Sequence, residues 1–243
     1  MTNEPILPFS LPKEDGFSVE WDERLKGFKI NIPHGELFYF KYFFNQKISD
    51  RSIESFLENN LNNWKTTDWK NITVEDFKSI CFENINWKHD SINLYGENIL
   101  LPRITSWYGD PGKSYSYSGI NSNPNEWNKE LVDIKERIEE VANAKFNSVL
   151  MNWYRDGEDH LNWHADDEKE LGVNPIISSV SFGSTRDFVL RKNDKSSKIN
   201  IPLYHGTLLI MKGALQHYWQ HSIPQRKKVK DARINLTFRF INN

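Results

Sequence analysis

The sequence predicts a mixed α/β fold that is mainly β, with an antiparallel sandwich or jelly roll as its core. Six short segments rich in β-branched and aromatic residues follow one another in the second half of the chain. Gly, Pro or Asn-Asp punctuate them and few helical segments intervene, which is typical of antiparallel sheets. Fifteen Phe, nine Trp and nine Tyr among 243 residues favour strands and can fill a sizeable core.

The N-terminal third is less regular than the rest. Residues 1–18 hold three prolines without a hydrophobic period, so we expect a flexible segment. Residues 28–44 alternate and are densely aromatic, which predicts one or two strands. Apolar spacing predicts a helix over 49–61, with one of its first two residues as the N-cap. Because 62–90 show no clear period, we expect 19–91 to form an N-terminal extension packed on the core.

The clearest helix is predicted over residues 125–144. Its apolar residues recur at steps of four and three and form a single stripe, which indicates a helix that supports a core. The six strand-like segments follow this helix. They are 146–154, 175–183, 186–192, 198–206, 207–213 and 233–242.

Composition excludes several classes of protein. A net charge of -2 gives no global electrostatic attraction to nucleic acid or to an anionic membrane, so a polyanion would need a local basic patch. The single cysteine, Cys81, excludes an internal disulfide and fits a reducing compartment. No apolar run of about 18 residues appears. We therefore expect a soluble intracellular monomer without a membrane partner.

The stretch "HLNWHADDE" (160–168) is the first candidate for chemistry. On an extended segment His164 and Asp166 project to the same face, so both could reach one ion. A third ligand could come from His217 or His221 in "QHYWQHSIP". Two His and one carboxylate leave three positions open, an arrangement suited to non-haem Fe(II) with a bidentate cosubstrate and O2.

Two alternatives compete with this iron site. His160 and His164 are four residues apart, as are His217 and His221, and on helices such pairs could form a zinc site. The neighbouring Gly157 and other poor helix formers disfavour helices there. A solvated cluster of surface His and Asp residues, without any metal, also remains open from this stretch alone.

A second motif, "RINLTFRF", strengthens the case for a site. Arg233, Asn235, Thr237 and Arg239 alternate with apolar residues, so one face of this strand carries two arginines. If that face points into the sheet interior, the arginines need a buried anionic partner, because an unpaired buried charge is very costly. A dicarboxylate would satisfy both guanidiniums. A solvent-exposed polar face is the alternative.

Over about residues 92–241 the chain resembles the AlkB family of Fe(II)/2-oxoglutarate dioxygenases, and most of all the branch that acts on DNA in animals. The motifs that carry the resemblance are "LYGENILLPR", "YGDPGKSYSYSG", "NWYRDGEDHLNWHADDE", "SVSFGSTRDF", "LYHGTLLIM", "HSIP" and "RINLTFR", in family order. The resemblance implies a double-stranded β-helix (jelly roll) domain over 92–243, with a nucleotide-recognition segment at 92–124. Trp153 stands where the family often has a charged residue, a departure that is harmless if Trp153 faces outward.

Carried over position by position, the resemblance implies a role for thirteen residues. Iron would be bound by His164, Asp166 and His221, which favours His221 over His217. 2-Oxoglutarate would be contacted by Asn152, Tyr154, Arg233, Thr237 and Arg239. The substrate would be contacted by Tyr115 and Tyr117 at the base, by Asp167 and Glu168, and by Tyr95 as a wedge in duplex DNA.

The implied activity is oxidative demethylation of N-alkylated bases such as 1-methyladenine and 3-methylcytosine in DNA. It would be coupled to decarboxylation of 2-oxoglutarate, with Fe(II) and O2, and would release formaldehyde. The basic run at 226–230 is a candidate for phosphate contacts. An RNA demethylase, a hydroxylase of a protein side chain and a non-catalytic binder are the alternatives. Either nucleic acid would place the protein in the nucleus or cytoplasm.

Overall fold

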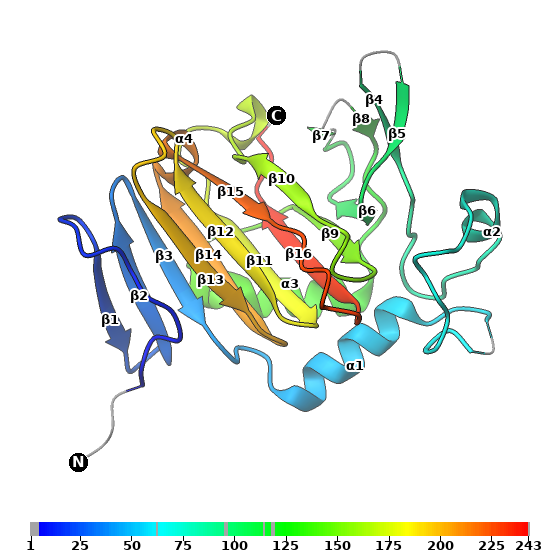
Figure 1. Ribbon diagram of the computed structural model, residues 1–243, viewed down its shortest axis with the longest axis horizontal. Coiled ribbons are helices and arrows are strands. Elements are labelled where there is room, and N and C mark those ends of the chain that lie inside the picture. Colours follow the sequence, from blue (N-terminus) through cyan, green and yellow to red (C-terminus); the bar gives the residue numbers. More distant parts are fainter. Residues whose placement is uncertain (1–4, 62, 95–96, 114, 118–119, 243) are drawn as a thin grey trace.

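The fold consists of two antiparallel sheets that face each other as a jelly roll, with helices outside (Figure 1). The computed structural model describes residues 5–61, 63–94, 97–113, 115–117 and 120–242, with backbone alone at 92–94, 98, 115–117 and 120–122. The larger sheet contains, in spatial order, β1 (Ser18–Asp22), β2 (Gly27–Ile32), β3 (Gly35–Phe40), β14 (Thr207–Gly213), β11 (Ile177–Gly183), β16 (Arg233–Arg239), β9 (Ser148–Tyr154) and β6 (Ile104–Gly109). The smaller sheet contains β10 (Leu161–His164), β15 (Trp219–Ile223), β12 (Arg186–Lys192) and β13 (Lys198–Leu203).

The expected jelly-roll architecture is confirmed. All six predicted strands form, as β9, β11, β12, β13, β14 and β16. The prediction of strands within 28–44 is also confirmed, because β2 and β3 form a hairpin there. β3 pairs with β14, so the N-terminal extension adds three strands to the edge of the larger sheet. Two further hairpins, β4 (Ser91–Leu94) with β5 (Glu97–Leu100) and β7 (Tyr115–Tyr117) with β8 (Ile120–Ser122), stand at the side away from β1 (Figure 1).

Both predicted helices form, with shifted ends. The first, α1 (Gln46–Leu57), begins three residues before the predicted range because Asn45 is its N-cap, accepting a hydrogen bond from the Ile48 N–H at 3.0 Å. This corrects the expected cap. The long helix, α3 (Lys129–Ala142), is capped by Asn128 and ends at Asn143, whose φ of 48° lies in the left-handed region.

Three shorter helical segments complete the list of elements. They are α2 (Val74–Lys78), α4 (Leu215–Tyr218) and a 3-10 turn, η1 (Lys169–Leu171). None of the helices in the described ranges is long and apolar enough to cross a membrane.

Two hydrophobic clusters hold the layers together. One lies between the two sheets and includes Tyr154, Phe188 and Leu190. The other lies on the outer face of the larger sheet, where α1, α3 and the N-terminal extension cover it. Residues 5–17 form no helix or strand, but Leu7, Phe9, Leu11 and Phe17 pack against the inter-sheet cluster. The described part of the expected flexible segment is therefore docked on the core.

The irregular segment 62–90 packs against one residue of β9. Trp153 points away from the space between the sheets and is fully buried. The rings of Trp69, Trp87 and Phe82 lie 5.0, 5.5 and 5.9 Å from the Trp153 ring. The extension therefore covers the outer face of the strand that carries Asn152 and Tyr154.

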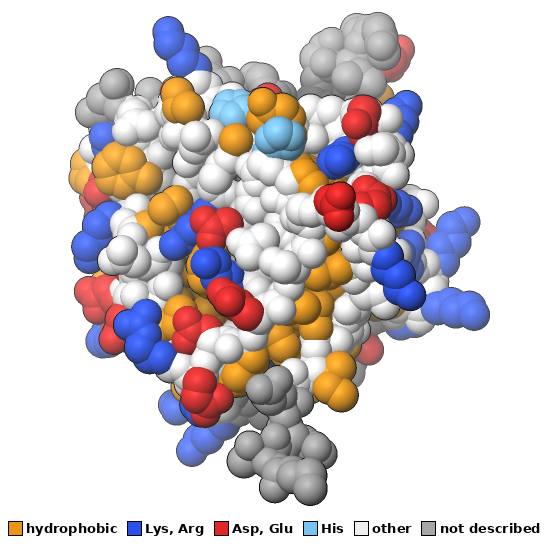
Figure 2. Space-filling view, turned by 90° about the vertical axis from the view of Figure 1, so that its left-hand side faces the viewer, with side chains coloured by type: hydrophobic (Ala, Val, Ile, Leu, Met, Phe, Trp, Pro, Cys, Tyr) orange, Lys and Arg blue, Asp and Glu red, His pale blue; other side chains and the backbone are white. Residues whose placement is uncertain are grey.

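The face on the β1 side carries charges of both signs. Figure 2 shows acidic and basic side chains interspersed over this face, with hydrophobic patches between them. Lys29, for example, lies 3.7 Å from both Glu20 and Glu36. A mixed surface of this kind does not attract a polyanion, so a nucleic acid would have to bind elsewhere on the molecule.

Candidate functional site

Two strands of the smaller sheet bring two histidines together beside one aspartate. His164 ends β10 and pairs directly with His221 on β15, and their ring centroids lie 4.1 Å apart. Asp166 follows β10 by two residues and is buried. One ligand atom from each of these residues lies within 4.8 Å of the others. The predicted trio is therefore assembled, on extended segments as expected.

The two histidines are held by their surroundings. His164 Nδ1 lies 2.8 Å from the Asn162 carbonyl, so Nδ1 is the donor and Nε2 is the ring nitrogen that faces a metal. Phe188 stacks on the His221 ring at 4.8 Å. Burial, together with a smaller contribution from the nearby His164, lowers the pKa of His221 to about 3. His221 is therefore a neutral imidazole at neutral pH, the form that binds a metal.

Asp166 is oriented by two neighbours. Its Oδ1 accepts a hydrogen bond of 2.7 Å from Nη2 of Arg239, and its backbone N–H donates to Oε1 of Gln216 at 3.0 Å. Burial would raise the pKa of Asp166, but its interactions with the Arg239 guanidinium and, less strongly, with the two imidazoles outweigh burial and hold the pKa at about 2. The other oxygen, Oδ2, is buried without a hydrogen-bond partner, 4.0 Å from Nε2 of His221. An ionised, unpartnered oxygen beside a neutral imidazole suits a divalent cation.

The polar face of β16 points between the sheets, and its two arginines have different partners. Arg239 is paired with the Asp166 carboxylate at 2.7 Å, while the expectation that one dicarboxylate satisfies both guanidiniums remains a prediction. Arg233 is 1% exposed, and its Nη2 donates to the Ser181 hydroxyl at 2.8 Å and to Oδ1 of Asn235 at 2.6 Å. Its Nε and Nη1 have no partner.

Arg233 is therefore a buried cation without a carboxylate partner among the described residues. Burial lowers its pKa to about 10, so it remains protonated at neutral pH. A buried charge of this kind is costly unless an anion neutralises it. The pocket that Arg233 lines also includes the trio, which places an anion site and a cation site in one cavity.

The two predicted residues on β9 line the same pocket. Asn152 and Tyr154 are both almost fully buried. Asn152 Oδ1 accepts a hydrogen bond of 2.8 Å from Nε of Arg103, and the Tyr154 ring lies under the Arg233 guanidinium at 5.1 Å. Thr237 also lines the pocket and accepts a hydrogen bond from Asn235 at 2.9 Å. All five residues assigned to the cosubstrate thus surround one cavity.

The residues assigned to the substrate are less fully described. Asp167 is exposed, and Glu168 is partly buried with Oε2 lacking a hydrogen-bond partner. Tyr115 and Tyr117 lie on β7, where the description covers the backbone alone. Tyr95 lies outside the described residues. Their predicted contacts to a base remain predictions.

The helical zinc alternative is wrong. His160 precedes β10 and His221 lies on β15, so neither histidine pair shares a helix. His217 lies on α4 and is exposed, outside the trio. The basic run at 226–230 is exposed apart from Val229, and Arg226 is already paired with Asp187 at 2.5 Å.

Some residues of the site were not predicted. Asn235 links Ser179, Ser181, Arg233 and Thr237 through its side chain. The sequence indicated only that Asn235 lies on the same face of the strand as Arg233, because the two residues are two positions apart. Arg103 closes the motif LYGENILLPR, but its contact with Asn152 was not predicted, and Gln216 gave no indication because it reaches Asp166 from 50 positions away.

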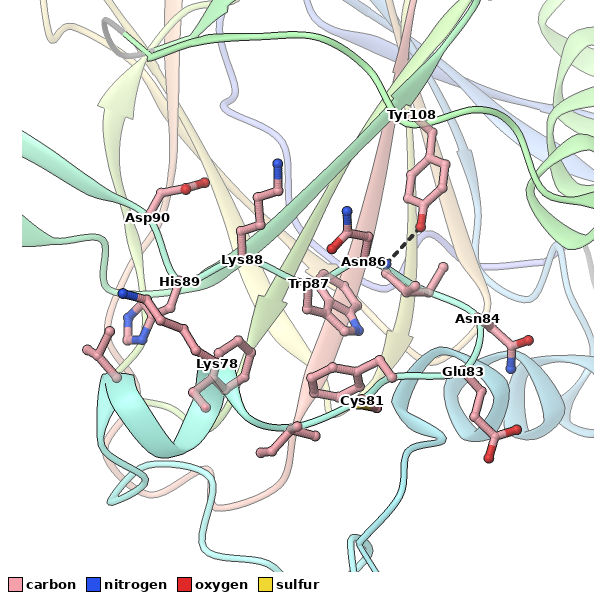
Figure 3. A pocket seen from close by; sticks show the side chains of 15 residues that line it. Lys78, Cys81, Glu83, Asn84, Asn86, Trp87, Lys88, His89, Asp90 and Tyr108 are labelled. Atoms are coloured by element: carbon pink, nitrogen blue, oxygen red, sulfur yellow. Dashed lines mark hydrogen bonds between the residues drawn. The ribbon is translucent and has the colours of Figure 1, made fainter.

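A larger cavity lies within the N-terminal extension and differs in its chemistry. It is bounded by residues 74–90 and Tyr108, whose hydroxyl accepts a hydrogen bond from the Asn86 N–H at 2.9 Å (Figure 3). Both basic and acidic side chains, including Lys78, Lys88 and Asp90, surround it (Figure 3). The metal-binding trio is not part of it, so chemistry is assigned to the cavity between the sheets.

Comparisons with known proteins agree with this site. Residues 49–239 match the family model described as the 2OG-Fe(II) oxygenase superfamily. The chain is 46% identical over 187 residues to the human alpha-ketoglutarate-dependent dioxygenase alkB homolog 3, covering 73% of this chain and 62% of that protein. It is 42% identical over 158 residues to the human DNA oxidative demethylase ALKBH2, covering 62% and 60%.

A plant relative is more distant. The DNA oxidative demethylase ALKBH2 of Arabidopsis thaliana is 35% identical over 188 residues, covering 65% of this chain and 59% of that protein. The chain thus spans less than two thirds of the length of each of these three relatives.

Proposed function

Because the chain belongs to the 2OG-Fe(II) oxygenase superfamily, we propose that it is an Fe(II)/2-oxoglutarate-dependent dioxygenase that demethylates N-alkylated bases in DNA. One observation carries this proposal. A trio of metal ligands and a buried, unneutralised arginine face the same cavity. A 2-oxo dicarboxylic acid can satisfy both, with its oxo acid end at the metal and its distal carboxylate at the arginine.

Each residue of the cavity has a defined task in this proposal. His164, Asp166 and His221 hold Fe(II). Arg233 binds the distal carboxylate of 2-oxoglutarate through its unpartnered N–H groups. Asn152, Tyr154 and Thr237 line the cosubstrate pocket, and Arg239 keeps Asp166 ionised and oriented.

When bound, iron, 2-oxoglutarate and O2 supply the oxidising power, with succinate, CO2 and formaldehyde as products. The protein contributes placement and the exclusion of water. Asp166 and His221 are buried between the two sheets, His164 is partly buried at the pocket, and Phe188 and Ile223 add apolar walls. Such a dry cavity directs oxidation to a methyl group that is brought to its mouth.

The proposed substrates are 1-methyladenine and 3-methylcytosine, as the resemblance to the AlkB family implies, and relatives that carry the name DNA oxidative demethylase support DNA as their carrier. A methylated base in a duplex has lost its pairing, which makes it cheaper to extrude from the stack. We propose that Tyr115 and Tyr117 contact the extruded base, with Asp167 and Glu168 nearby and Tyr95 in the gap. All three metal ligands come from one chain, so we expect a monomer to suffice. A DNA substrate would place the enzyme in the nucleus or cytoplasm.

Mass spectrometry of methylated oligonucleotides tests this function. Single- and double-stranded DNA with one 1-methyladenine or 3-methylcytosine would be incubated with the protein, Fe(II), 2-oxoglutarate and ascorbate. The expected result is loss of one CH2 unit that requires 2-oxoglutarate. It should vanish in His164→Ala and persist in the control His160→Ala, whose imidazole lies outside the trio.

Other outcomes would redirect the proposal. Demethylation of a matched RNA oligonucleotide in preference to DNA would assign an RNA substrate. Succinate formation without loss from either nucleic acid would retain the iron chemistry and favour a protein side chain. No succinate under any condition would refute the dioxygenase.

A further inference from the structure

A second buried arginine lies beside the proposed cosubstrate pocket without lining it. Arg186, on β12, is 1% exposed, and its guanidinium lies over the Tyr154 ring at 5.6 Å from the centroid. Arg233 lies over the same ring at 5.1 Å. In the described parts of the chain neither guanidinium forms an ion pair with a carboxylate. Two buried positive charges therefore share one tyrosine.

Arg186 also fixes the chain on both sides of the metal ligands. Its Nη1 donates to the Asp156 carbonyl at 2.9 Å, and its Nη2 donates to the Asp159 and Pro224 carbonyls at 2.8 Å each. The two aspartates lie in the loop between β9 and β10, which joins Tyr154 to His164. Pro224 follows β15, three residues after His221. The Arg186 guanidinium thus links the loop that leads from β9 to His164 with the end of β15, the strand that carries His221.

Packing alone does not explain this residue. Burial lowers the pKa of Arg186, which reflects the cost of holding its charge away from water. Three carbonyls offset part of that cost, but an apolar side chain of similar volume would avoid it. The charge of Arg186 lies beside that of Arg233 and adds to the positive electrostatic potential at this end of the pocket. The distal carboxylate of 2-oxoglutarate would lie there.

We propose that Arg186 is a positioning residue for a dicarboxylate cosubstrate, which it serves by fixing the Tyr154 ring and adding a second positive charge behind Arg233. This inference rests on the proposed use of 2-oxoglutarate. Because Arg186 acts through Tyr154 and through its field, its loss should weaken cosubstrate binding. It should leave the binding of the metal unchanged, because the direct pairing of β10 with β15 still holds His164 beside His221.

Isothermal titration calorimetry of 2-oxoglutarate into the Mn(II)-loaded protein tests the proposal without turnover. The variants are Arg186→Met and Arg186→Lys. The matched control is Arg191→Met, because Arg191 lies on the same strand and stacks on an aromatic ring, Trp163, at 4.0 Å, outside the pocket. Mn(II) affinity and thermal melting are measured for each variant.

We expect Arg186→Met to raise the Kd for 2-oxoglutarate about tenfold, since a buried charge acts through a low effective dielectric. Arg186→Lys keeps the charge but loses the planar stack, and should raise the Kd about threefold. Mn(II) affinity should stay within about twofold in both, because no metal ligand is removed. In steady-state assays the loss should appear in the KM for 2-oxoglutarate more than in kcat.

Several results would overturn the inference. These are an unchanged Kd for 2-oxoglutarate in Arg186→Met, or a parallel loss of Mn(II) affinity, which would make Arg186 a scaffold for the metal loops alone. If Arg186→Met does not fold, an unchanged Kd in Arg186→Lys decides against it. Wild-type protein that binds Mn(II) but no 2-oxoglutarate would refute the proposed function itself, and this inference with it.

Discussion

Replacement of Arg233 by Met is the sharpest test of the cosubstrate pocket. The side chain is buried on β16, and its Nη2 is committed to Ser181 and Asn235 while Nε and Nη1 have no partner. Met fills a similar volume without charge or donors. Asn235 keeps hydrogen bonds from Ser179 and Ser181 in the variant, so its amide is not left without partners.

The size of the effect follows from the lost contacts. The unpartnered N–H groups on Nε and Nη1 of Arg233 can donate charge-assisted hydrogen bonds to an anion, and losing these bonds together with the charge should cost about 3 kcal/mol of binding free energy. That cost corresponds to an increase of about 150-fold in the KM for 2-oxoglutarate. The unliganded protein should respond in the opposite direction. Removal of an unneutralised buried charge leaves its melting temperature unchanged or raises it.

Two measurements check this pair of expectations. Succinate formation as a function of 2-oxoglutarate concentration gives KM and kcat for wild type, Arg233→Met and the control Arg191→Met. Thermal melting with and without 2-oxoglutarate, in the presence of Mn(II), gives the stabilisation by the ligand, which should disappear in Arg233→Met alone. An unchanged KM, or a melting temperature that falls while ligand stabilisation persists, would refute the role assigned to Arg233.

Three further outcomes are expected. Asp166→Ala should abolish turnover and lower the Mn(II) affinity measured by calorimetry. Normal activity in this variant would refute the assignment of the trio as the metal site. Asp159→Asn should destabilise the fold by about 3 kcal/mol in urea unfolding, because the fully buried carboxylate pairs with Arg155 at 2.8 Å. Burial would raise the pKa of Asp159, but Arg155 lowers it below 3.8. The stability that this ion pair contributes is therefore present above pH 3.8 and lost as the pH falls through the lowered pKa. If the loss of stability at acid pH were the same in Asp159→Asn as in the wild type, this assignment would be contradicted. Tyr95→Ala should reduce activity on duplex DNA more than on single strands, and equal losses would leave the wedge unsupported.

The predictions from sequence succeeded where a residue's neighbours lie nearby in the chain. Alternation along β16 was enough to indicate that Arg233 and Arg239 share a face, and the spacing of His164 and Asp166 was enough to predict that their ligand atoms lie close together. The partner of Arg239 could not be predicted in this way. Its pairing with Asp166 joins residues 73 positions apart, and local periodicity carries no information on such a contact.

The largest differences from prediction lie in the N-terminal extension. Proline-rich composition indicated a flexible start, but four apolar side chains at 7, 9, 11 and 17 dock it on the inter-sheet core. An irregular segment at 62–90 gave no periodic pattern because it forms few regular elements. Its tryptophans and phenylalanines are instead recruited by tertiary packing against Trp153.

Strand β9 thus separates the pocket between the sheets from the aromatic cluster of the N-terminal extension. Asn152 and Tyr154 face the cosubstrate cavity, while Trp153 between them is enclosed by rings from the extension. A cavity opened behind β9, for example by Trp87→Ala, would let the strand shift and move both cosubstrate residues together. Affinity for 2-oxoglutarate can therefore be tuned from a segment whose described residues never line the pocket. A chain shortened to begin at residue 92 would lose the aromatic rings that pack on Trp153 behind the pocket.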